Sequence, residues 1–522
     1  MASNLFNSKA LFCFFKILIT KACNKIYLLR KASNSCATHL EIEKYPFLAS
    51  REELLLNKTL LFHMEGTLLK SSSTFPYFML VAFEGGGPLR ALILLLLYPF
   101  LCLVNDEIGL KIMVFVSFVG IKVESFRIGR TVLPKFFLED VGNEGFDLVM
   151  ACGRKMGVSD MPRVMIDGFL RYYLGIEEVF GRELKVVCGY FVGLMEAKKA
   201  SKAFLETLEK PKIASDVIGF ACQNKSLDQH FFAHCQAIYL VSEAEKRTWH
   251  ILPRQKYTKP LIFHDGRLAF RPTPLATLAM FMWIPFGFIL CLIRAFLGLL
   301  LPYKLSIPIL YLTGMGGTLF IPKSFISQLN NKEKSKGILY VCNHNTLFDP
   351  IYASIAIMKP LTAVTYSLSK VSEFLAPIKT VRLTRNREND SKLIKELLSK
   401  GDVLICPEGT TCREPYLLRF SPLFAETSNY IVTAAINFEV SMFYANTAGG
   451  LKCLDPILLL MNPYITSNIK ILELLTCQFV GKSKFEVANY VQAQIGKALN
   501  YECTSLTRKD KYMFLAGNEG II

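Results

Sequence analysis

Two side chains in the last third of the chain have the types and the spacing of a proton-abstracting pair. His344 comes five residues before Asp349, within the segment 343–350. Histidine is the usual base when an alcohol must lose a proton near neutral pH, and a carboxylate on its second ring nitrogen fixes the tautomer and stabilises the imidazolium. Five residues exceed one helical turn, so we expect the side chains to meet only if the first turn is irregular, as Pro350 would favour.

Two segments that follow this pair contain residues suited to hold a phosphate. The first carries arginines directly after the strand-like run 378–381, and a guanidinium group can donate two hydrogen bonds to one phosphate. The second, 407–413, follows the apolar run 402–406, and its glycine lets the backbone turn tightly and expose N–H groups. Its glutamate can hold a substrate hydroxyl or one of the arginines. The candidate substrate-binding residues are Arg382, Arg385, Glu408, Gly409, Thr410 and Arg413. With the base, they predict acyl transfer to an alcohol that carries a phosphate.

The elements that must position these residues alternate between strand-like and helical patterns. From about Tyr303 onwards, apolar runs typical of buried strands are separated by helical stretches, which indicates an α/β sandwich over 303–522. In open α/β sheets, ligands bind where a strand ends in a loop. The expected elements are Gly337–Val341, Thr346–Ile357, Leu361–Tyr366, Asp390–Lys400, Val403–Cys406 and Ile431–Asn437.

Residues 45–270 are expected to form a separate mixed α/β domain. Thr59–Met64 is typical of a buried strand. A hydrophobic insertion near 89–121 contains two apolar runs, Ala91–Val104 and Ile112–Ile121, both short for a bilayer span. These runs form either an embedded or re-entrant helical hairpin, or the buried helices of a cap.

The clearest membrane candidate is Pro274–Ile293, about twenty uncharged residues, a length that fits the hydrocarbon thickness. Arg294 interrupts the apolar run, which continues as Ala295–Leu301, so the membrane segment covers 274–301. Pro285 lies within it and can kink a helix. The segment therefore predicts either a single span or a helical hairpin that returns to the same face. Either would join the two α/β domains by membrane-embedded hydrophobic helices.

Residues 1–44 form a basic N-terminal segment. Its first 40 residues contain no aspartate or glutamate and carry lysines and an arginine among apolar side chains. Such a start fits a mitochondrial transit peptide, an interfacial amphipathic helix, or a plain positively charged flank. The sequence leaves these three alternatives open.

The composition of the whole chain favours a membrane-bound protein with globular parts. Hydrophobic residues make up 52% of the 522 residues and the mean hydropathy is +0.32. The formal net charge of +17 suits nucleic acid or an anionic membrane surface. Because no nucleic-acid-binding signature accompanies it, we expect a lipid bilayer and no nucleic acid as partner. The 15 cysteines form no C-x-x-C pair, so we expect no metal site and reduced thiols that face the cytosol.

Three segments stand in the same order as those of a known enzyme family. They read N-H-x-T-L-x-D-P, then R-x-T-R, then P-E-G-T-T-x-R-E-P-Y-L-L-R-F-S from Pro407 to Ser421. This order resembles the glycerolipid acyltransferase superfamily. More narrowly, it is similar to the land-plant glycerol-3-phosphate acyltransferases that act at the sn-2 position. The resemblance extends from about Lys44 to the end of the chain, and the long third segment is highly specific for that branch.

Two positions depart from the pattern of that family. The family usually has an arginine after the histidine, where this chain has Asn345, and a proline in the segment I-V-P-V-A, where it has Thr433. The first departure removes one potential contact to a phosphate or to CoA. Matched position by position, the resemblance assigns the base to His344 and its orienting partner to Asp349. It assigns the glycerol phosphate to the substrate-binding residues named above.

The resemblance also implies a first domain similar to the haloacid-dehalogenase-type phosphatases. Those enzymes need D-x-D-G-T, in which the first aspartate attacks phosphorus and bridges Mg²⁺ and the second acts as acid and base. The matching stretch is H-M-E-G-T, with His63, Glu65 and Thr67. Ser159 stands for the usual Ser/Thr, and the metal-binding region is reduced to Asp228. A neutral imidazole is a poor ligand for Mg²⁺ and cannot form the acyl phosphate, so we expect a degenerate motif, no metal and no phosphatase activity.

The resemblance implies an enzyme that moves an acyl group from acyl-CoA to glycerol 3-phosphate, at the sn-2 hydroxyl. The product would be lysophosphatidic acid, for glycerolipids or for cutin- and suberin-type polyesters. No cofactor is implied, because acyl-CoA is a co-substrate. The alternatives are an acyltransferase with a lysophospholipid acceptor and a non-catalytic membrane scaffold. We expect the endoplasmic reticulum membrane with the catalytic domain facing the cytosol, and the mitochondrial membrane as the alternative. The sequence does not indicate an oligomeric state.

Overall fold

The chain divides into two compact units. The first comprises Met1–Pro260 and Pro272–Pro274, and the second Leu261–Arg271 and Leu275–Ile522. The basic segment 1–40 and Asp228 lie outside the described residues, and the domain bounds given above stay a prediction. The computed structural model describes residues 41–44, 56, 58–196, 217–223, 232, 234–325, 337–359, 361–366, 368–428, 430–476 and 483–519.

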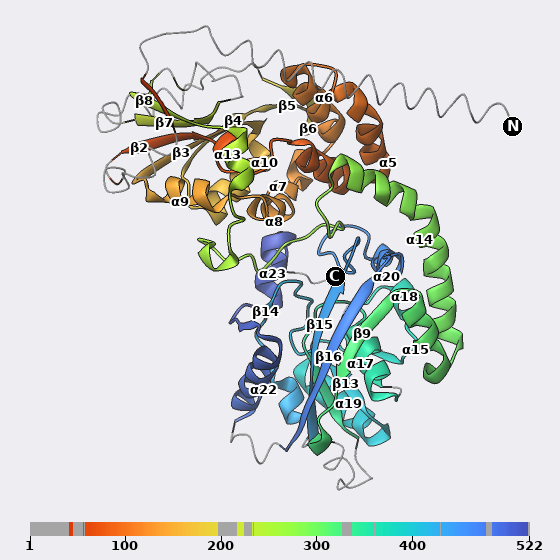
Figure 1. Ribbon diagram of the computed structural model, residues 1–522. Coiled ribbons are helices and arrows are strands. Elements are labelled where there is room, and N and C mark those ends of the chain that lie inside the picture. Colours follow the sequence, from red (N-terminus) through yellow and green to blue (C-terminus); the bar gives the residue numbers. More distant parts are fainter. Residues whose placement is uncertain are drawn as a thin grey trace, which may run out of the picture. The chain divides into compact units, whose positions relative to one another are not determined.

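The first unit is built on a six-stranded sheet in which every pair of neighbouring strands runs parallel (Figure 1). Its central strand is completely buried, as expected for a parallel sheet that is covered on both faces. In spatial order the strands are β1 (Glu41–Lys44), β8 (Ala237–Val241), β7 (Val217–Cys222), β2 (Thr59–His63), β3 (Arg154–Pro162) and β4 (Glu178–Arg182). The first unit also contains a separate antiparallel hairpin of two strands, β5 (Leu184–Val187) and β6 (Tyr190–Met195). The short helices are α4 (Met64–Thr67), α7 (Ile128–Thr131), α8 (Leu133–Leu138), α9 (Asn143–Ala151), α10 (Arg163–Asp167) and α13 (Glu243–Thr248).

The hydrophobic insertion of this unit is a pair of packed helices, α5 (Phe75–Leu101) and α6 (Asp106–Phe118). Helix α5 bends at Gly87, whose φ of 81° lies in the left-handed region and which precedes a proline. The residues before the bend are largely buried, whereas several leucines and a phenylalanine beyond it are exposed. Both alternatives for this insertion, the embedded hairpin and the cap, therefore stay predictions.

The second unit contains a seven-stranded mixed sheet. Its strands pair in parallel except for β15 and β16, which run antiparallel. In spatial order they are β12 (Thr380–Arg382), β11 (Thr362–Thr365), β13 (Val403–Ile405), β10 (Leu339–Cys342), β15 (Tyr430–Val440), β16 (Ile465–Thr476) and β9 (Met315–Phe320). A separate two-stranded sheet pairs β14 (Tyr416–Leu417) with β17 (Glu502–Cys503).

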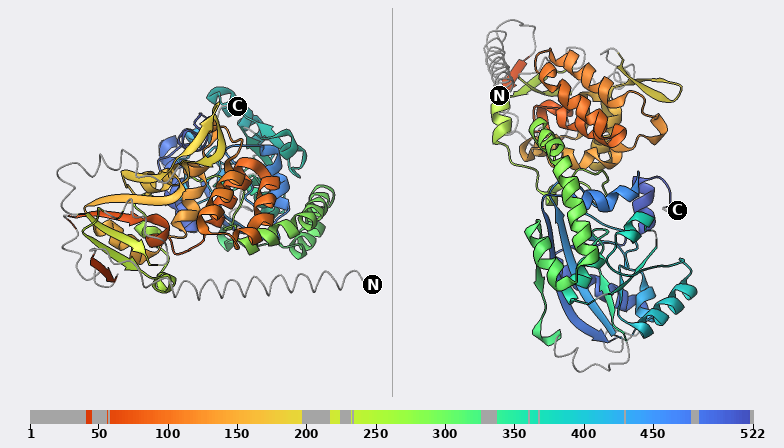
Figure 2. Two further views of the ribbon diagram at one scale, coloured as in Figure 1. Left: turned by 90° about the horizontal axis from the view of Figure 1, so that it is seen from above. Right: turned by 90° about the vertical axis from the view of Figure 1, so that its right-hand side faces the viewer.

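Helices flank this sheet, and two of them close its main core (Figure 2). Side chains of α19 and α22, such as Ile394 and Val491, pack against strand residues that include Val341 and Ile431. The sheet thereby holds rigidly the loops that leave the carboxyl ends of β10, β11 and β13. The helices are α15 (Tyr303–Leu312), α17 (Asp349–Ile357), α18 (Lys370–Phe374), α19 (Arg387–Lys400), α20 (Asp455–Leu460), α22 (Lys484–Leu499) and α23 (Arg508–Leu515).

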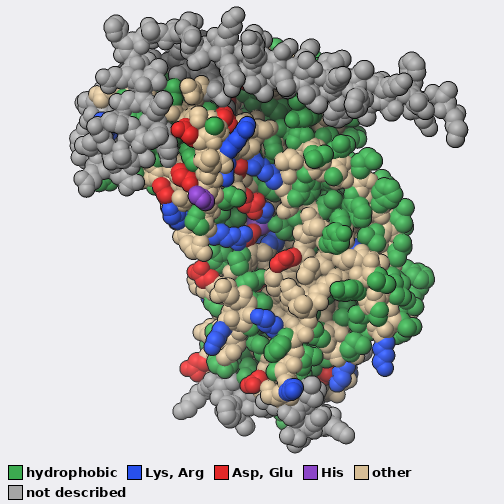
Figure 3. Space-filling model, viewed as in Figure 1, with side chains coloured by type: hydrophobic (Ala, Val, Ile, Leu, Met, Phe, Trp, Pro, Cys, Tyr) green, Lys and Arg blue, Asp and Glu red, His purple; other side chains and the backbone are tan. Residues whose placement is uncertain are grey.

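The predicted membrane segment is one continuous helix, α14 (Pro274–Leu300), which runs through Pro285 without turning back. Within the described residues, α5 and α14 are long and apolar enough to cross a membrane, by length and composition alone. Only 28% and 22% of their most apolar windows are buried. Figure 3 shows the hydrophobic side chains gathered along α14. These features agree with the expected membrane association.

Arg294 explains why a charge interrupts this apolar helix. Its side chain is 1% exposed, and one guanidinium nitrogen donates to the backbone oxygens of Leu460 and Asn462 at 2.7 and 2.6 Å. The other nitrogens donate to the backbone oxygen and the hydroxyl of Thr313. Arg294 thus fastens α14 to the turns that follow α15 and α20.

Replacing Arg294 by methionine should destabilise the second unit. The substitution keeps the apolar stem but leaves several buried carbonyl groups without a donor, at a cost of about 1–3 kcal/mol each. We expect the melting temperature of the detergent-solubilised protein to fall by at least roughly 6–12 °C. The control Ile293→Met changes an exposed neighbour on the same helix. Equal melting temperatures for the two variants would contradict the role given to Arg294.

Candidate active site

The candidate site lies where strands of the second unit end. His344 follows β10 and the segment 407–413 follows β13, and these two strands are direct neighbours. Asn343 fixes the end of β10, because its side chain both donates to the backbone oxygen of Ile436 and accepts from the N–H of Ile436, each at 2.8 Å. The backbone oxygen of His344 accepts from the N–H of Cys412 at 2.7 Å, which ties the two loops together.

His344 and Asp349 are brought into direct contact. The imidazole Nδ1 lies 3.0 Å from Asp349 Oδ2. The helix expected over 346–357 begins only at Asp349, because Pro350 suits a first helical turn and disfavours a helical residue before it. The preceding residues form an irregular turn in which Thr346 donates its N–H and its hydroxyl to the two carboxylate oxygens, at 2.8 and 2.9 Å. Asp349 is fully buried, so this turn fixes its orientation.

The surroundings of His344 favour its protonated form. Burial acts in the opposite direction, but the adjoining Cys406 sulfur and the Asp349 carboxylate outweigh it, and the pKa of His344 is raised well above 6.5. Cys406 contacts Cys342, their sulfurs 3.4 Å apart, and this hydrogen bond together with burial raises the pKa of the Cys406 thiol. A thiol with a raised pKa is neutral at pH 7, so the carboxylate of Asp349 supplies the charge that strengthens the base.

Glu408 positions the backbone of the site. Its Oε1 accepts from the N–H of His344 at 2.7 Å and its Oε2 from the N–H of Leu418 at 2.9 Å. The side chain is 4% exposed, and burial raises the pKa of Glu408 to about 7. Glu408 does not belong to the cavity lining. Its role in substrate binding stays a prediction, whereas these contacts support a role in holding His344.

The loop after β13 contains Gly409 and Thr410, which both line the cavity. Gly409 has a φ of 66°, in the left-handed region that favours glycine. Lys511 of α23 holds the loop from behind, with its Nζ donating to the hydroxyl of Thr410 at 3.3 Å and to the backbone oxygen of Thr411 at 2.6 Å. Burial, and then the neighbouring Arg413, lower the pKa of Lys511 to about 8. No motif of the sequence pointed to this lysine, which lies about one hundred residues further along the chain.

The three predicted arginines do not gather around the cavity. Arg382 is exposed and pairs with Glu373 at 2.5 Å. Arg413 lies over the ring of Tyr444 at 4.2 Å and donates to the backbone oxygen of Asn446. Neither they nor Arg385 line the cavity. Their roles in substrate binding stay predictions.

Arg385 nevertheless has an unusual local structure. It has a φ of 68° and is not a glycine, which costs free energy. The buried Asp390 holds this conformation by accepting from the N–H groups of Thr384 and Arg385 at 2.7 and 2.9 Å. The guanidinium carbon of Arg385 lies 5.9 Å from the ring centroid of Tyr366, which lines the cavity.

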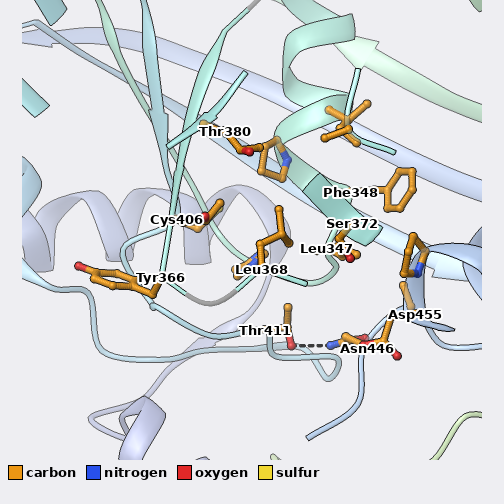
Figure 4. A pocket seen from close by; sticks show the side chains of 18 of the residues that line it. Leu347, Phe348, Tyr366, Leu368, Ser372, Thr380, Cys406, Thr411, Asn446 and Asp455 are labelled. Carbon is orange, nitrogen blue, oxygen red and sulfur yellow. Dashed lines mark hydrogen bonds between the residues drawn. The ribbon is translucent and has the colours of Figure 1, made fainter. Parts of the chain in front are cut away.

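The cavity has a volume of about 160 Å³ and is lined by both polar and apolar side chains (Figure 4). His344 lines it together with Cys406, Gly409 and Thr410. Polar side chains of the lining include Thr411, Asn446, Thr447, Lys452, Asp455 and Tyr512. Apolar side chains include Leu347, Phe348, Ile351, Leu368, Leu375 and Ile378. This mixed lining suits a reaction between a polar acceptor and an apolar chain.

The two departures from the family pattern lie in the interior. Asn345 is 4% exposed, and its amide donates to the backbone oxygen of Cys412 at 3.1 Å. Thr433 is 1% exposed and sits in β15 where the pairing with β16 shifts its register between Val432 and Ala434. Neither residue lines the cavity. Both departures therefore leave the contacts of His344 intact.

The degenerate motif of the first unit follows β2. His63 Nδ1 accepts from the N–H of Gly66 and its Nε2 lies 3.2 Å from Asp160 Oδ2, so the ring is hydrogen-bonded on both sides. Thr67 is buried and its hydroxyl donates to the backbone oxygen of His63 at 2.8 Å. These residues do not fit a magnesium site, because an imidazole replaces the first carboxylate and the oxygen Oε1 of Glu65 accepts three hydrogen bonds.

Comparison with known proteins gives two family matches. Residues 59–241 match the family described as "Glycerol-3-phosphate acyltransferase RAM2-like, HAD-like domain", and residues 323–437 match the family described as "Acyltransferase". These matches confirm the two-part α/β architecture expected from the sequence.

Similar proteins from plants cover almost the whole chain. "Probable glycerol-3-phosphate acyltransferase 3" of Arabidopsis thaliana is 54% identical over 90% of this chain and 92% of its own length. "Glycerol-3-phosphate acyltransferase 1" of the same organism is 44% identical over 92% and 87%. "Glycerol-3-phosphate acyltransferase RAM2" of Petunia hybrida is 40% identical over 88% and 97%.

Replacing Asp349 by asparagine should move the pH dependence of catalysis. A base works only when it is neutral, so activity is lost as the pH falls through the pKa of His344, which lies above 6.5 in the intact protein. The variant lacks the carboxylate that raises this pKa, so we expect the acid limb of kcat/KM to move to lower pH. We expect kcat to fall by about 10²–10⁴-fold because the tautomer is no longer fixed. An acid limb that stays in place or moves to higher pH would contradict the pairing.

Proposed function

The chain belongs to the plant glycerol-3-phosphate acyltransferase family and is a transferase, and on that premise we propose that it moves an acyl group from acyl-CoA to the sn-2 hydroxyl of glycerol 3-phosphate. The product is lysophosphatidic acid. The observation that carries the proposal is the 3.0 Å contact between His344 and the buried Asp349 at a cavity lined by both polar and apolar side chains.

In the proposed reaction, His344 takes the proton of the sn-2 hydroxyl while the oxygen attacks the thioester carbon. A tetrahedral intermediate forms, and the C–S bond then breaks to release the CoA thiolate, which takes the proton back from the imidazolium. Asp349 stabilises that imidazolium through Nδ1. Backbone N–H groups of the loop that begins at Gly409 stabilise the oxyanion, because this loop lines the cavity next to His344. The acyl chain lies against the apolar side chains that line the cavity.

We assign the phosphate of the acceptor to a basic rim made of Arg385, Lys452 and Arg508. Lys452 lines the cavity, and its Nζ lies 5.3 Å from the ring centroid of Tyr512. Arg508 approaches the same ring at 5.8 Å, as Arg385 approaches Tyr366. Burial, and then the positive charge of Arg385, lower the pKa of Arg508, as repulsion between two nearby cations would. An anion between them would remove this repulsion.

Membrane association and location follow from the same proposal. The apolar helix α14 would keep the second unit close to its acyl products. We propose the endoplasmic reticulum membrane, with the second unit facing the cytosol and the mitochondrial membrane as alternative. The acyl products would enter glycerolipids or polyesters of the cutin and suberin type.

The basic rim can be tested by kinetics. Arg508→Gln and Arg385→Gln should each raise KM for glycerol 3-phosphate by about 10–100-fold, the effect of one charge-assisted hydrogen bond, with little change in KM for acyl-CoA. Arg382→Gln is the matched control, because the Arg382 guanidinium is already held by the carboxylate of Glu373 and the backbone oxygen of Leu368. If only Arg382→Gln raised this KM, the phosphate would belong to Arg382 and the assignment to the basic rim would be wrong.

The reaction itself can be tested with microsomal protein and a panel of acyl-CoAs. We expect glycerol 3-phosphate to yield sn-2 lysophosphatidic acid, and lysophosphatidate to be a poor acceptor. His344→Ala should lose about 10²–10⁴-fold in turnover, because it removes the base. His250→Ala is the control, since His250 is exposed and pairs with Glu144 in the first unit. Wild-type turnover in His344→Ala, or acylation of lysophosphatidate alone, would refute the proposal.

A further inference from the structure

The first unit contains a group of hydrogen-bond donors that point at one atom. They lie at the carboxyl edge of its parallel sheet, where β2 ends at His63 and pairs with Val158 of β3. Directly after Val158, the pairing of β3 with β4 shifts its register until Pro162. The segment 159–161 is therefore released from the regular ladder, and its N–H groups can serve another acceptor.

That acceptor is the side chain of Glu65. Its Oε1 accepts from the hydroxyl of Ser159 at 2.5 Å, from the N–H of Asp160 at 3.1 Å and from the N–H of Met161 at 3.2 Å. The hydroxyl of Ser159 in turn accepts from the N–H of Met161 at 3.0 Å, which orients its own hydrogen toward the carboxylate. Three donors on one oxygen form an anion cradle of the kind that holds one oxygen of a phosphate.

One buried cation lies near this cradle. Lys246 is fully buried, and its Nζ donates to the backbone oxygen of Glu65 at 3.0 Å and lies 3.6 Å from Oε1 of Glu243. His63 Nδ1 lies 3.6 Å from the other oxygen of Glu65, Oε2, but it accepts from the N–H of Gly66 and so offers this carboxylate no hydrogen. The carboxylate of Glu65 is thus held mainly by the cradle.

Glu65 and two residues of the cradle line one cavity. This cavity has a volume of about 380 Å³, and its lining includes Glu65, Asp160, Met161, Asp106 and Glu107. Glu65 is 1% exposed, and its second oxygen, Oε2, is buried without a hydrogen-bond partner among the described residues. One carboxylate oxygen therefore fills the cradle, and the other adds negative charge to an already acidic cavity wall.

We propose that Glu65 is a built-in anionic ligand that occupies an oxyanion site formed by Ser159, Asp160 and Met161. In the intact protein the carboxylate excludes phosphate from the first unit. Without that carboxylate, the cradle binds inorganic phosphate or a phosphate monoester. The inference is independent of the acyl-transfer proposal, because it concerns only residues of the first unit. One consequence is that the chain does not withdraw a phosphorylated product into this cavity.

The test is a gain of binding in the full chain. Glu65→Ala, and as a second variant Glu65→Ser, should acquire phosphate binding, which the intact protein lacks. At a tenfold excess of phosphate over its Kd, the melting temperature of either variant should rise by roughly 3–6 °C relative to chloride at equal ionic strength. Isothermal titration with phosphate gives the affinity directly. No phosphate release from esters is expected, because His63 cannot form the acyl phosphate.

Two controls make the outcome specific. Glu65→Gln keeps an amide oxygen in the cradle and should remain insensitive to phosphate. The double variant Glu65→Ala/Ser159→Ala lacks one donor and should bind phosphate at least about tenfold more weakly than Glu65→Ala. If a single variant is unstable when isolated, phosphate in the buffer should restore a folded protein. A folded Glu65→Ala protein without a phosphate response, failure of phosphate to rescue an unstable one, or an equal response of the intact protein would overturn the proposal.

Discussion

The hydrogen bond between His344 and Asp349 is the interaction on which the proposed chemistry of the second unit depends. It joins a fully buried carboxylate to an imidazole that reaches the cavity. The surrounding contacts keep both partners in place: Thr346 binds the two oxygens of Asp349, and Glu408 binds the N–H of His344. A carboxylate held in this way favours the imidazolium that appears when an alcohol gives up its proton.

The two units place a buried carboxylate at the carboxyl edge of parallel strands, but the carboxylate has different hydrogen-bond partners in each unit. In each unit, the residues of interest follow neighbouring strands at the carboxyl edge of parallel strands. In the second unit, the carboxylate of Asp349 contacts Nδ1 of His344, and Asp349 itself does not line the cavity. In the first unit, the carboxylate of Glu65 occupies the hydrogen-bond donors itself. The two units therefore differ in whether a carboxylate of the chain itself occupies the hydrogen-bond donors at this edge.

Much of this architecture could be predicted from the sequence because it is encoded locally. Apolar runs mark the strands, and the motif residues directly follow them, as with His344 after β10 and Gly409 after β13. The family and the two-part α/β fold were predicted on the same segments and confirmed by the comparisons. Helix α17 begins at Asp349, three residues later than expected, because the irregular turn that Pro350 favours takes up all of the preceding segment 346–348.

Contacts between distant segments could not be predicted in this way. Lys511 and Arg508 of α23 approach two residues that line the cavity, Thr410 and Tyr512, and nothing in their local pattern separates them from solvated lysines and arginines. Glu408 stands in a motif, but only the folded chain shows that both its oxygens accept backbone N–H groups. Arg382 likewise could not be separated from Arg385, since their different directions depend on Glu373 and on the left-handed backbone of Arg385.

The most direct test of the central claim is an experimental structure with glycerol 3-phosphate and a non-hydrolysable acyl-CoA analogue bound. The account predicts that the sn-2 oxygen lies about 2.6–3.2 Å from the imidazole nitrogen of His344 that does not face Asp349, with the thioester carbon beyond it. A ternary complex in which that hydroxyl lies out of reach of His344, and bonds to another side chain instead, would contradict it.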